Sequence, residues 1–512
     1  MVDVFLSCDS ASRAAGSRQL EAVLRREQAR RSDFGLTLTG SRGAFFMEPM
    51  LEVGTTAGRV AYGNVAVADV PFLLSAGMLE GKPIAPFYLG DPEQIPFLKG
   101  QTRVTFARCG RIACDSPLAY EKDGGLAGLR AALQRAPQDV IDEVQRSQLR
   151  GRGGAAFPTG VKWQTVAACA ADQKYIVANG DEGDPGTYAD RMLMEGDPFA
   201  VLEGMAIAAW AVGASQGFVY IRAEYPRAAA AMRTAAEKAR QAGWLGRDIL
   251  SSGFGFDVEV RQGGGTYVCG EETALLESLE GKRGIVRAKP PYPATCGLFG
   301  KPTIVNNITT LATIPAIIGR GGDWYASMGT GRSRGAMALQ LAGALATPGL
   351  VEVPFGITLR QVIQEYGGGA RPGRKLIAVQ AGGPLGDLLG EDRWDIPIDF
   401  DAFAAAGGML GHGGIVAYDD QTDIAALAYR LMEFCAHESC GKCAPCRMGA
   451  QRSAEILASM RLGNGMLDDE QALDDVAFAM RGASLCALGG MAPTPVLSAM
   501  KLFPEAFRPP TR

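Results

Sequence analysis

Three thiols at three-residue spacing occur in the segment Glu438-Ser439-Cys440-Gly441-Lys442-Cys443-Ala444-Pro445-Cys446-Arg447. A fourth thiol, Cys486, follows in Ser484-Leu485-Cys486-Ala487. Three thiols in one tight turn and a distant fourth suit the corners of a [4Fe–4S] cluster. Structural zinc sites usually take paired ligands from separate loops, so zinc is the less favoured alternative, with disulfides or free thiols as the third. The segment therefore predicts a redox protein whose C-terminal region folds around a metal centre.

Length and composition indicate the broad class of protein to which the chain belongs. The 512 residues suffice for about three or four domains. Lys plus Arg number 51 and Asp plus Glu number 55, a mild negative charge that gives no sign of a nucleic-acid partner. No run of 18 apolar residues occurs, and residues 202–221 are interpreted as a buried helix leading into a strand. The N-terminus lacks the pattern of a signal peptide. We expect a cytoplasmic protein without direct membrane contact.

Histidine is scarce in this chain, which contains only His412 and His437. This argues against metal sites with several histidines and against Ser-His or Cys-His catalysis. His412 lies between glycines and is interpreted as part of a turn. His437 precedes the first cluster cysteine and is either a bystander or an outer residue that tunes the cluster. Hydride and electron transfer need no protein nucleophile, because a cofactor carries the chemistry.

The first region, residues 1–95, is predicted to contain strand, helix, strand, strand and helix. These elements are expected over 4–7, 12–31, 44–53, 58–62 and 67–78. The order fits a thioredoxin-like domain. A linker is expected over 90–120; it contains Cys109 and Cys114, to which the sequence assigns no role.

Three further regions follow, and together they predict an α/β multidomain fold. Helices alternate with apolar strands over residues 120–330, which indicates a Rossmann-like α/β domain. Residues 335–420 carry short strands and glycine-rich turns, typical of a small β-rich module. Residues 422–512 are mostly helical and contain the four thiols of the predicted cluster.

A glycine-rich loop, residues 149–163, opens the α/β region. Its bare backbone can approach a phosphate or a flat ring closely. Gly151 to Ala156 fits the degenerate dinucleotide pattern, but the preceding residues 141–149 are polar and helical rather than a buried strand. The context of a standard Rossmann fingerprint is therefore missing. A glycine-rich surface turn stays open as the alternative.

Two acidic loops and a pair of amides complete the candidate site. Residues 179–187 follow a predicted strand directly, and ligands of open α/β sheets bind at that end of a strand. Their spacing does not fit a calcium loop, and carboxylates suit sugar hydroxyls better than phosphates; a solvated acidic turn is the alternative. Residues 265–273 almost form a P-loop, but Glu271 replaces the lysine, which favours a nucleotide or flavin site over an NTPase. Asn306 and Asn307 could bond a flavin, or form an ordinary turn.

Together these segments resemble the NADH-oxidising flavoprotein subunit of respiratory complex I and its soluble relatives. The resemblance covers roughly residues 125–500 and rests on five ordered motifs: 151–163, 179–191, 265–272, 303–307 and the cysteine set. It implies an FMN- and NAD-binding domain over 120–330, a ubiquitin-like (SLBB-type) module over 335–420, and a helical [4Fe–4S] domain over 422–512. The cofactors implied are noncovalent FMN and one [4Fe–4S] cluster, with NAD as substrate.

The resemblance also implies roles for individual residues. The residues that would line the FMN and NAD site are Gly151, Arg152, Gly153, Gly154, Lys162, Asn179, Asp181, Glu182, Gly183, Asp184, Gly270, Glu271, Glu272, Val305, Asn306 and Asn307. Phe157 and Tyr292 would contact the adenine end of NAD, and Tyr267 with Glu272 would lie near the nicotinamide. The cluster ligands would be Cys440, Cys443, Cys446 and Cys486.

Two positions depart from the family pattern. Ala156 stands where the family usually has glycine. Asp184 stands where a longer glutamate often faces the NAD ribose, and a shorter carboxylate could repel a 2′-phosphate less. The preference for NAD over NADP is therefore an expectation that rests on few residues.

The N-terminal region helps to choose among the complexes to which the chain could belong. Residues 42–53 and 61–65 resemble the thioredoxin-like [2Fe–2S] subunit of the same complexes, yet Cys8 is the only cysteine before residue 109, so the cluster ligands are missing. The β subunit of a molybdenum-dependent, NAD-linked formate dehydrogenase resembles the chain best. Its partners would be a [2Fe–2S] thioredoxin-like subunit and a catalytic subunit with molybdenum and iron–sulfur centres.

The implied reaction is hydride exchange between NAD and FMN, followed by single-electron exchange between FMN and the cluster. No acid–base residue of the chain is needed for the hydride step, and Lys162 with backbone N–H groups would stabilise charge on the reduced flavin. The alternatives are a diaphorase subunit of an NAD-reducing hydrogenase, a complex I subunit, a non-enzymatic iron–sulfur electron-transfer scaffold and a zinc-binding regulatory protein.

Overall fold

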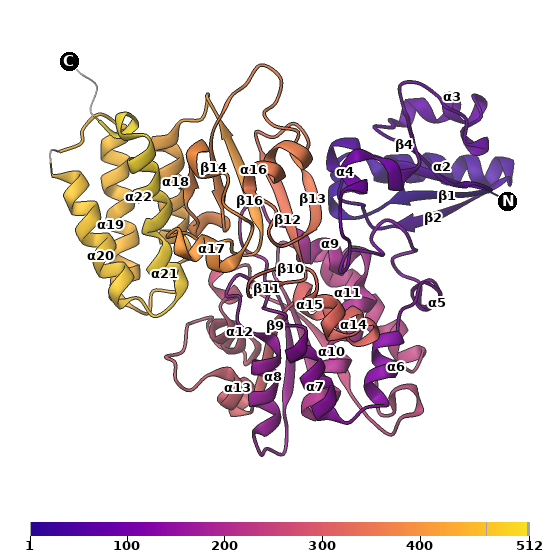
Figure 1. Cartoon of the computed structure of the whole chain (residues 1–512), viewed down its shortest axis with the longest axis horizontal. Coiled ribbons are helices and arrows are strands. Elements are labelled where there is room, and N and C mark those ends of the chain that lie inside the picture. Colours follow the sequence, from indigo (N-terminus) through magenta and orange to yellow (C-terminus); the bar gives the residue numbers. More distant parts are fainter. Residues whose placement is uncertain (1, 467, 509–512) are drawn as a thin grey trace.

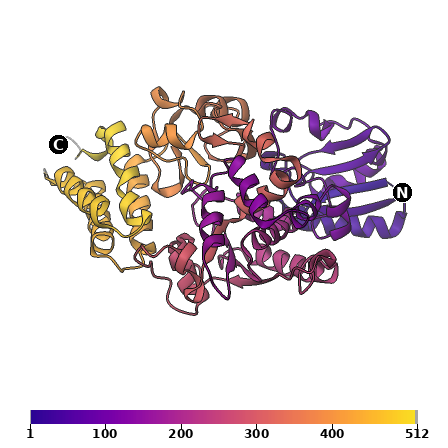
Figure 2. The same ribbon diagram turned by 60° about the horizontal axis from the view of Figure 1, so that its bottom comes forward.

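The computed structural model describes residues 2–466 and 468–508. The N-terminal region and the C-terminal helices lie at opposite ends of an elongated molecule, and the α/β and β-rich regions lie between them (Figures 1 and 2). None of the helices in these residues is long and apolar enough to cross a membrane.

The N-terminal region folds around a mixed sheet with the order β2-β1-β3-β4-β5. Strand β1 runs parallel to β2 and antiparallel to β3. The main elements are β1 (Val2–Ser7), α1 (Ser10–Ala14), α2 (Ser17–Arg31), β2 (Phe34–Thr39), β3 (Leu51–Thr55), β4 (Gly58–Tyr62), α3 (Val70–Ser75) and β5 (Tyr88–Gly90).

Three details of this region differ from the expectation. The helix predicted over 12–31 is divided into α1 and α2 at Ala15 and Gly16, where Gly16 has φ +112°. Strand β2 was not expected at all. The strand predicted over 44–53 is also wrong in its first half, where the chain forms a short 3-10 helix, Phe45–Met47, and only Leu51 begins β3. Pro49 offers no N–H to a ladder, and the buried Glu48 carboxylate accepts hydrogen bonds from Ser7 and Ser41 instead of leaving the chain extended.

The expected linker, residues 90–120, is packed rather than free. It contains the short helices α4 (Pro96–Lys99) and α5 (Pro117–Lys122). The backbone N–H groups of Val104, Thr105 and Phe106 all donate to the buried carboxylate of Glu352 in the β-rich region. The thiol of Cys114 lies 3.9 Å from that of Cys8. The N-terminal region is therefore attached firmly to the rest of the chain.

The α/β region contains a parallel sheet with the order β8-β7-β6-β9. Its strands are β6 (Tyr175–Gly180), β7 (Gln216–Ile221), β8 (Asp257–Gln262) and β9 (Thr303–Asn307). The helices that matter for the site are α7 (Pro137–Arg146), α8 (Thr159–Ala168), α9 (Ala189–Gly196), α10 (Pro198–Val212), α11 (Pro226–Gln241), α12 (Glu272–Leu279) and α14 (Ile308–Arg320). The polar helix expected before residue 149 is α7, and the buried helix leading into a strand is α10 followed by β7.

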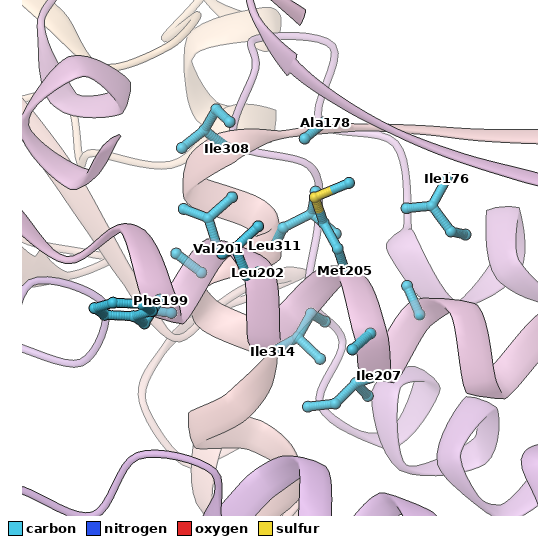
Figure 3. Close-up of a cluster of buried hydrophobic side chains, with 14 of the residues drawn as sticks. Ile176, Ala178, Phe199, Val201, Leu202, Met205, Ile207, Ile308, Leu311 and Ile314 are labelled. Carbon is cyan, nitrogen blue, oxygen red and sulfur yellow. The ribbon is translucent and has the colours of Figure 1, made fainter. Parts of the chain in front are cut away.

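Helix α10 forms the centre of this core. It is apolar on nearly all sides, as expected for a helix surrounded by protein. Met205 and Ile207 pack with Leu311 and Ile314 of α14 beneath the sheet (Figure 3). A Cβ at Gly204 would overlap the main chain of α14, so glycine permits this close approach. The result is a rigid platform under the carboxyl ends of β6 and β9.

The β-rich region has the sheet order β13-β12-β16-β14-β15. Strands β12 and β16, the first and the last of this sheet in the sequence, are parallel neighbours, and the remaining pairs are antiparallel. The strands are β12 (Ala336–Gly343), β13 (Gly349–Pro354), β14 (Leu376–Ala381), β15 (Leu388–Leu389) and β16 (Gly414–Asp419). A small hairpin precedes them, β10 (Gly329–Thr330) with β11 (Ser333–Arg334). The turn before β16 carries His412 toward the α/β region.

The C-terminal region is a helical bundle. Its helices are α18 (Ile424–Glu438), α19 (Ala444–Arg461), α20 (Asp469–Ala483), α21 (Ala487–Met491) and α22 (Pro493–Leu502). Cys443 immediately precedes α19, and Cys486 immediately precedes α21. The turn between α18 and α19 and the turn before α21 therefore carry the four candidate ligands.

Candidate functional site

The loops expected to bind a cofactor meet at one edge of the parallel sheet. Residues 181–187 follow β6, and Asn307 ends β9 beside them, because β6 and β9 are parallel neighbours. The Asn179 side-chain amide donates to the Gly270 carbonyl at 2.8 Å, which joins the loop after β6 to the loop before α12. The structure thus brings these sequence-distant segments together at the edge where open α/β sheets bind ligands.

Asp181 lies at the centre of this arrangement. Its side chain is 2% exposed, and both carboxylate oxygens lack a hydrogen-bond partner among the described residues. Burial raises the pKa of Asp181 well above its usual value, with nearby Arg222 opposing the shift. A Cβ at Gly270 would lie 3.5 Å from one of its oxygens, so this glycine leaves room beside the carboxylate. An unsatisfied buried carboxylate next to bare backbone fits a ligand that donates hydroxyl groups.

The two glutamates at the start of α12 have different surroundings. Glu271 caps the helix by accepting from the N–H groups of Thr273 and Ala274, and Lys289 lies 2.8 Å from its carboxylate. Glu272 lies 3.1 Å from Lys162 of α8, whose ammonium also donates to the Val305 carbonyl. The Glu271 carboxylate is therefore held by protein groups, whereas the Glu272–Lys162 pair is partly exposed at the sheet edge.

The two amides of β9 are also engaged. Trp163 donates its indole N–H to the Asn306 side chain at 2.9 Å. The Asn307 side chain accepts from the Thr310 N–H at the start of α14 and donates to Asp190. These bonds fix the end of β9 and the first turn of α14 beside the glycine-rich loop.

The glycine-rich loop places its backbone, rather than its arginine, at the site. The Arg152 guanidinium is buried and donates to the Tyr325 hydroxyl and to the Arg334 and Ala336 carbonyls, between 2.7 and 3.1 Å. The guanidinium also donates to the Arg150 carbonyl and lies over the Phe355 ring, so these protein groups occupy the side chain and only the Arg152 main chain is available to a cofactor.

Several backbone positions in these loops require small residues. A Cβ at Gly153 would lie 3.0 Å from Asn307, while Gly151 has only ordinary contacts. Gly154 has φ +102°, in the region that favours glycine. Ala156 has φ +52°, so the structure strains the residue that departs from the family glycine.

The residues expected at the NAD end fall into two groups. Phe157 and Tyr292 are 51% and 58% exposed. Tyr267 is packed: its hydroxyl donates to Asp184 at 2.8 Å, and its ring lies against Gly183, where a Cβ would be 2.5 Å away. Burial raises the pKa of both Asp184 and Tyr267. Asp184, expected at the ribose, is thus held by the tyrosine.

Two side chains that brace the candidate loops, Arg222 and His412, were not expected to do so from the sequence. Arg222 donates to the Glu182 carbonyl at 2.7 Å and pairs with Glu224, bracing the loop after β6. Its place directly after β7, at the same sheet edge, was an available signal. His412 lies in a turn, as expected, and its buried side chain also contacts Glu182 and Asp190. No sequence signal links it to residues so far away in the chain.

The four candidate cluster ligands share one site. Burial raises the pKa of Cys446 to about 11; Ser439, 3.2 Å away, opposes this, and the other three ligand thiols reinforce it. Buried thiols suit ligation, because bound iron supplies the positive charge that a thiolate needs.

The cluster site lies against the α/β region. Cys440 and Cys486 pack on a core that includes Val268 and Leu275. The Lys442 ammonium donates to the Val286 carbonyl at 2.6 Å. The Tyr267 N–H donates to Glu438 of α18 at 2.9 Å. The bundle therefore contacts the segment that leads into α12, which also borders the flavin loops.

Comparison with known proteins agrees with this geometry. Residues 144–316 match the Nuo51 FMN-binding domain family, and residues 426–509 match the iron–sulfur binding region of NADH-ubiquinone oxidoreductase-F. The chain is 46% identical to the HndC subunit of the NADP-reducing hydrogenase of Solidesulfovibrio fructosivorans, over 80% of this chain and 83% of that protein. It is 46% identical to the F 2 subunit of the NADH-quinone oxidoreductase of Rhizobium meliloti, over 76% and 92%.

A solved structure extends the likeness to the N-terminal region. The crystal structure of NAD+-reducing [NiFe]-hydrogenase in the air-oxidised state matches with a TM-score of 0.69 at 30% identity, and the match covers 99% of this chain and 84% of that chain. The matched segments include the three loops, the orphaned Asp181 carboxylate and the four-thiol site. The chain therefore belongs to the family of NADH-oxidising flavoprotein subunits that join an FMN-binding domain to a [4Fe–4S]-binding region, and it is an NAD(H):acceptor oxidoreductase subunit.

Proposed function

We propose that this chain exchanges electrons between NAD(H) and a partner enzyme, with FMN held at the sheet edge and a [4Fe–4S] cluster held by Cys440, Cys443, Cys446 and Cys486. The single observation that carries the proposal is the buried, unpartnered carboxylate of Asp181, among the described residues, in a domain that packs against the four-thiol site. Bound FMN supplies the conversion between two-electron hydride transfer and single-electron transfer. The protein supplies binding, orientation and charge.

The residues around Asp181 would divide this work. Asp181 would accept hydrogen bonds from the hydroxyl groups of the flavin side chain, which would satisfy its buried oxygens. The glycines at 151, 153, 154 and 270 would give the cofactor access to backbone N–H groups. Lys162 holds an ammonium at the end of β9, where it would stabilise negative charge on the flavin.

The NAD end would use the exposed aromatic residues. Phe157 and Tyr292 would stack on the adenine, and Glu272 with Tyr267 would orient the nicotinamide. Asp184 would accept a hydrogen bond from the ribose in place of the one that it accepts from the Tyr267 hydroxyl. A 2′-phosphate would add negative charge beside this buried carboxylate, which supports NAD over NADP.

We assign the remaining regions by their sheets. Residues 1–95 are proposed to be a thioredoxin-like domain without [2Fe–2S] ligands, in which Cys8 is the only cysteine. Residues 335–420 are proposed to be a ubiquitin-like module, supported by the parallel first and last strands at its centre. Residues 120–330 and 422–512 are the proposed FMN/NAD and cluster domains. Because the reaction uses the NAD pool, we place the protein in the cytoplasm.

Two kinds of complex are candidates. The comparisons support an NAD-reducing hydrogenase or NADH-quinone oxidoreductase better than the formate dehydrogenase expected from the sequence, and the match over 99% of the chain is to a hydrogenase structure. We therefore propose a hydrogenase-type diaphorase first. A molybdenum-dependent formate dehydrogenase is the second candidate, supported by the missing cluster cysteines of the N-terminal region, and its partners would include a [2Fe–2S] thioredoxin-like subunit.

An anaerobic ultraviolet–visible spectrum tests the proposed reaction. We expect flavin bands that NADH bleaches, over a broad iron–sulfur shoulder. An iron–sulfur shoulder without flavin bands, even after FMN is added, would indicate an electron-transfer scaffold. A colourless protein would indicate a zinc-binding protein. The partner is tested by purifying the complex from its native host through a tag on this chain. Nickel with hydrogen-dependent NAD+ reduction supports the first candidate; molybdenum with formate-dependent reduction supports the second.

A further inference from the structure

His412 reaches from the β-rich region into the cofactor loops. It lies in the turn before β16, and its side chain is buried. Its Nδ1 atom lies 2.6 Å from the Arg152 carbonyl oxygen. Its Nε2 atom lies 3.1 Å from Glu182 Oε1 and 3.4 Å from Asp190 Oδ2. One imidazole therefore contacts the glycine-rich loop and two residues of the segment that follows β6, Glu182 and Asp190.

Each of the three partners controls one loop of the proposed flavin site. Arg152 belongs to the glycine-rich loop. Glu182 belongs to the loop after β6, and its carboxylate accepts from the N–H groups of Asp190 and Arg191 at the start of α9. Asp190 accepts from the N–H and hydroxyl groups of Thr309, and from the amide of Asn307 at the end of β9.

The partners of the two ring nitrogens specify the protonation state of the His412 imidazole. A carbonyl oxygen and two carboxylates can only accept hydrogen bonds, so both ring nitrogens must carry a proton to satisfy them. Burial opposes the charged ring, but Asp190 and Glu182 outweigh burial and raise the pKa of His412 to about 10. Asp190 feels the same contact from its side, since burial raises the pKa of Asp190 to about 6 and His412 limits the rise.

A bound divalent cation is the rival to this proton. The ligand atoms of Glu182, Asp190 and His412 all lie within 4.8 Å of one another. Both carboxylates already accept from backbone or side-chain donors, and the two oxygens nearest His412 are among the acceptors. A metal analysis of the purified protein distinguishes the cation from the proton, as described below.

We propose that His412 is a positioning residue whose buried imidazolium locks the glycine-rich loop, the loop after β6 and the end of β9 into the arrangement that binds FMN. The inference rests on the proposed flavin site between these loops. It gives the β-rich region a role in the chemistry of the α/β region, because the turn before β16 carries the positive charge that faces the two carboxylates from that side.

The first test compares His412→Gln with His437→Gln, a substitution of the exposed second histidine. Glutamine keeps one donor but loses the charge and one contact. We expect the FMN dissociation constant to rise at least tenfold in His412→Gln, with a changed visible circular dichroism of the bound flavin and an unchanged iron content of the cluster. His437→Gln should leave FMN affinity as in the wild type. Unchanged FMN affinity and flavin spectrum in His412→Gln would overturn the proposal.

A double variant separates charge pairing from simple packing. If the imidazolium acts by neutralising the carboxylates, Glu182→Gln together with His412→Gln should weaken FMN binding by less than the product of the two single effects. Independent multiplication of the two effects would contradict the charge-pairing argument. A wild-type protein that binds no FMN would instead overturn the proposed function itself, which keeps the two failures distinct.

A measurement on the intact protein covers the case in which His412→Gln does not fold. With only two histidines in the chain, nitrogen-15 histidine labelling of the oxidised His437→Gln holoprotein leaves one imidazole signal. We expect both ring nitrogens to be protonated at pH 8.5. A neutral ring at that pH, or a stoichiometric divalent metal outside the iron of the cluster, would overturn the assignment.

Discussion

Replacing Asp181 with asparagine should change stability and cofactor affinity in opposite directions. Both oxygens of this buried carboxylate lack a partner in the described protein. An unsatisfied buried polar group costs about 1–3 kcal/mol, and more when it is charged. Above pH about 3.8 the wild type must either bury the charge of Asp181 or take up a proton on folding, whereas Asp181→Asn removes the ionisable group at nearly constant volume, so the FMN-free protein should become more stable by about 1–3 kcal/mol.

The same substitution should weaken FMN binding. A hydrogen bond to a charged group contributes about 1.5–3 kcal/mol, and each 1.4 kcal/mol is a factor of ten in affinity. Loss of one such bond predicts an FMN dissociation constant about 10- to 150-fold higher. Thermal unfolding with and without FMN measures the first effect, and quenching of flavin fluorescence on binding measures the second.

The pH dependence of the FMN-free protein gives an internal control. Because the folded-state pKa of Asp181 is raised above 3.8, the folded protein holds a proton that the unfolded chain releases. Its stability should therefore fall as the pH rises above about 3.8, and Asp181→Asn should remove that contribution. A destabilised FMN-free variant with unchanged FMN affinity would refute the argument, since it would make Asp181 a structural residue.

Further predictions concern the other parts of the site. Cys443→Ala should abolish the iron–sulfur signal in electron paramagnetic resonance while FMN stays bound; loss of flavin with an intact cluster would contradict the division into two sites. Glu272→Gln should slow NADH oxidation with little change in the unfolding temperature, whereas an unchanged rate would remove this residue from the site. Gly183→Ala should displace the Tyr267 ring and raise KM for NADH by about tenfold or more, with FMN content unchanged, since the added Cβ would lie 2.5 Å from the ring. Because the pKa of His412 is raised from 6.5 to about 10, its stabilisation is complete below pH 6.5 and lost as the pH rises to 10; wild-type stability should fall across this window by up to about 1.4 kcal/mol per pH unit, and less steeply in His412→Gln.

The parts of the site that could be predicted are those encoded by local spacing. The four thiols are recognisable because three ligands stand in one turn, and the acidic loop is recognisable because it follows an apolar strand directly. The strand predicted over 44–53 failed because apolar residues suggested an extended chain although Pro49 interrupts the ladder. Glu48 instead accepts bonds across the domain, and such long-range contacts are invisible in a short window.

Side-chain direction could not be predicted for the same reason. Arg152 stands in a loop that suggests a phosphate contact, yet the fold surrounds its guanidinium with carbonyl groups from the hairpin and from β12. His412 stands between glycines that indicate a turn, and the turn is formed, but the β-rich region carries its side chain to Glu182. Each outcome depends on contacts between segments that are far apart in the sequence, which no local pattern specifies.

The contact between the bundle and the α/β region has a consequence for electron transfer. One short segment carries Tyr267 at the proposed NAD end and leads into α12, and the same segment is tied to the bundle through the bond from its N–H to Glu438. The Tyr267 ring also lies 5.1 Å from Phe434 of α18. A hinge between the two regions would have to break these contacts and expose the apolar surface under Cys440 and Cys486. The relative placement of the candidate cofactor loops and the four-thiol site is therefore held by packing between the two regions.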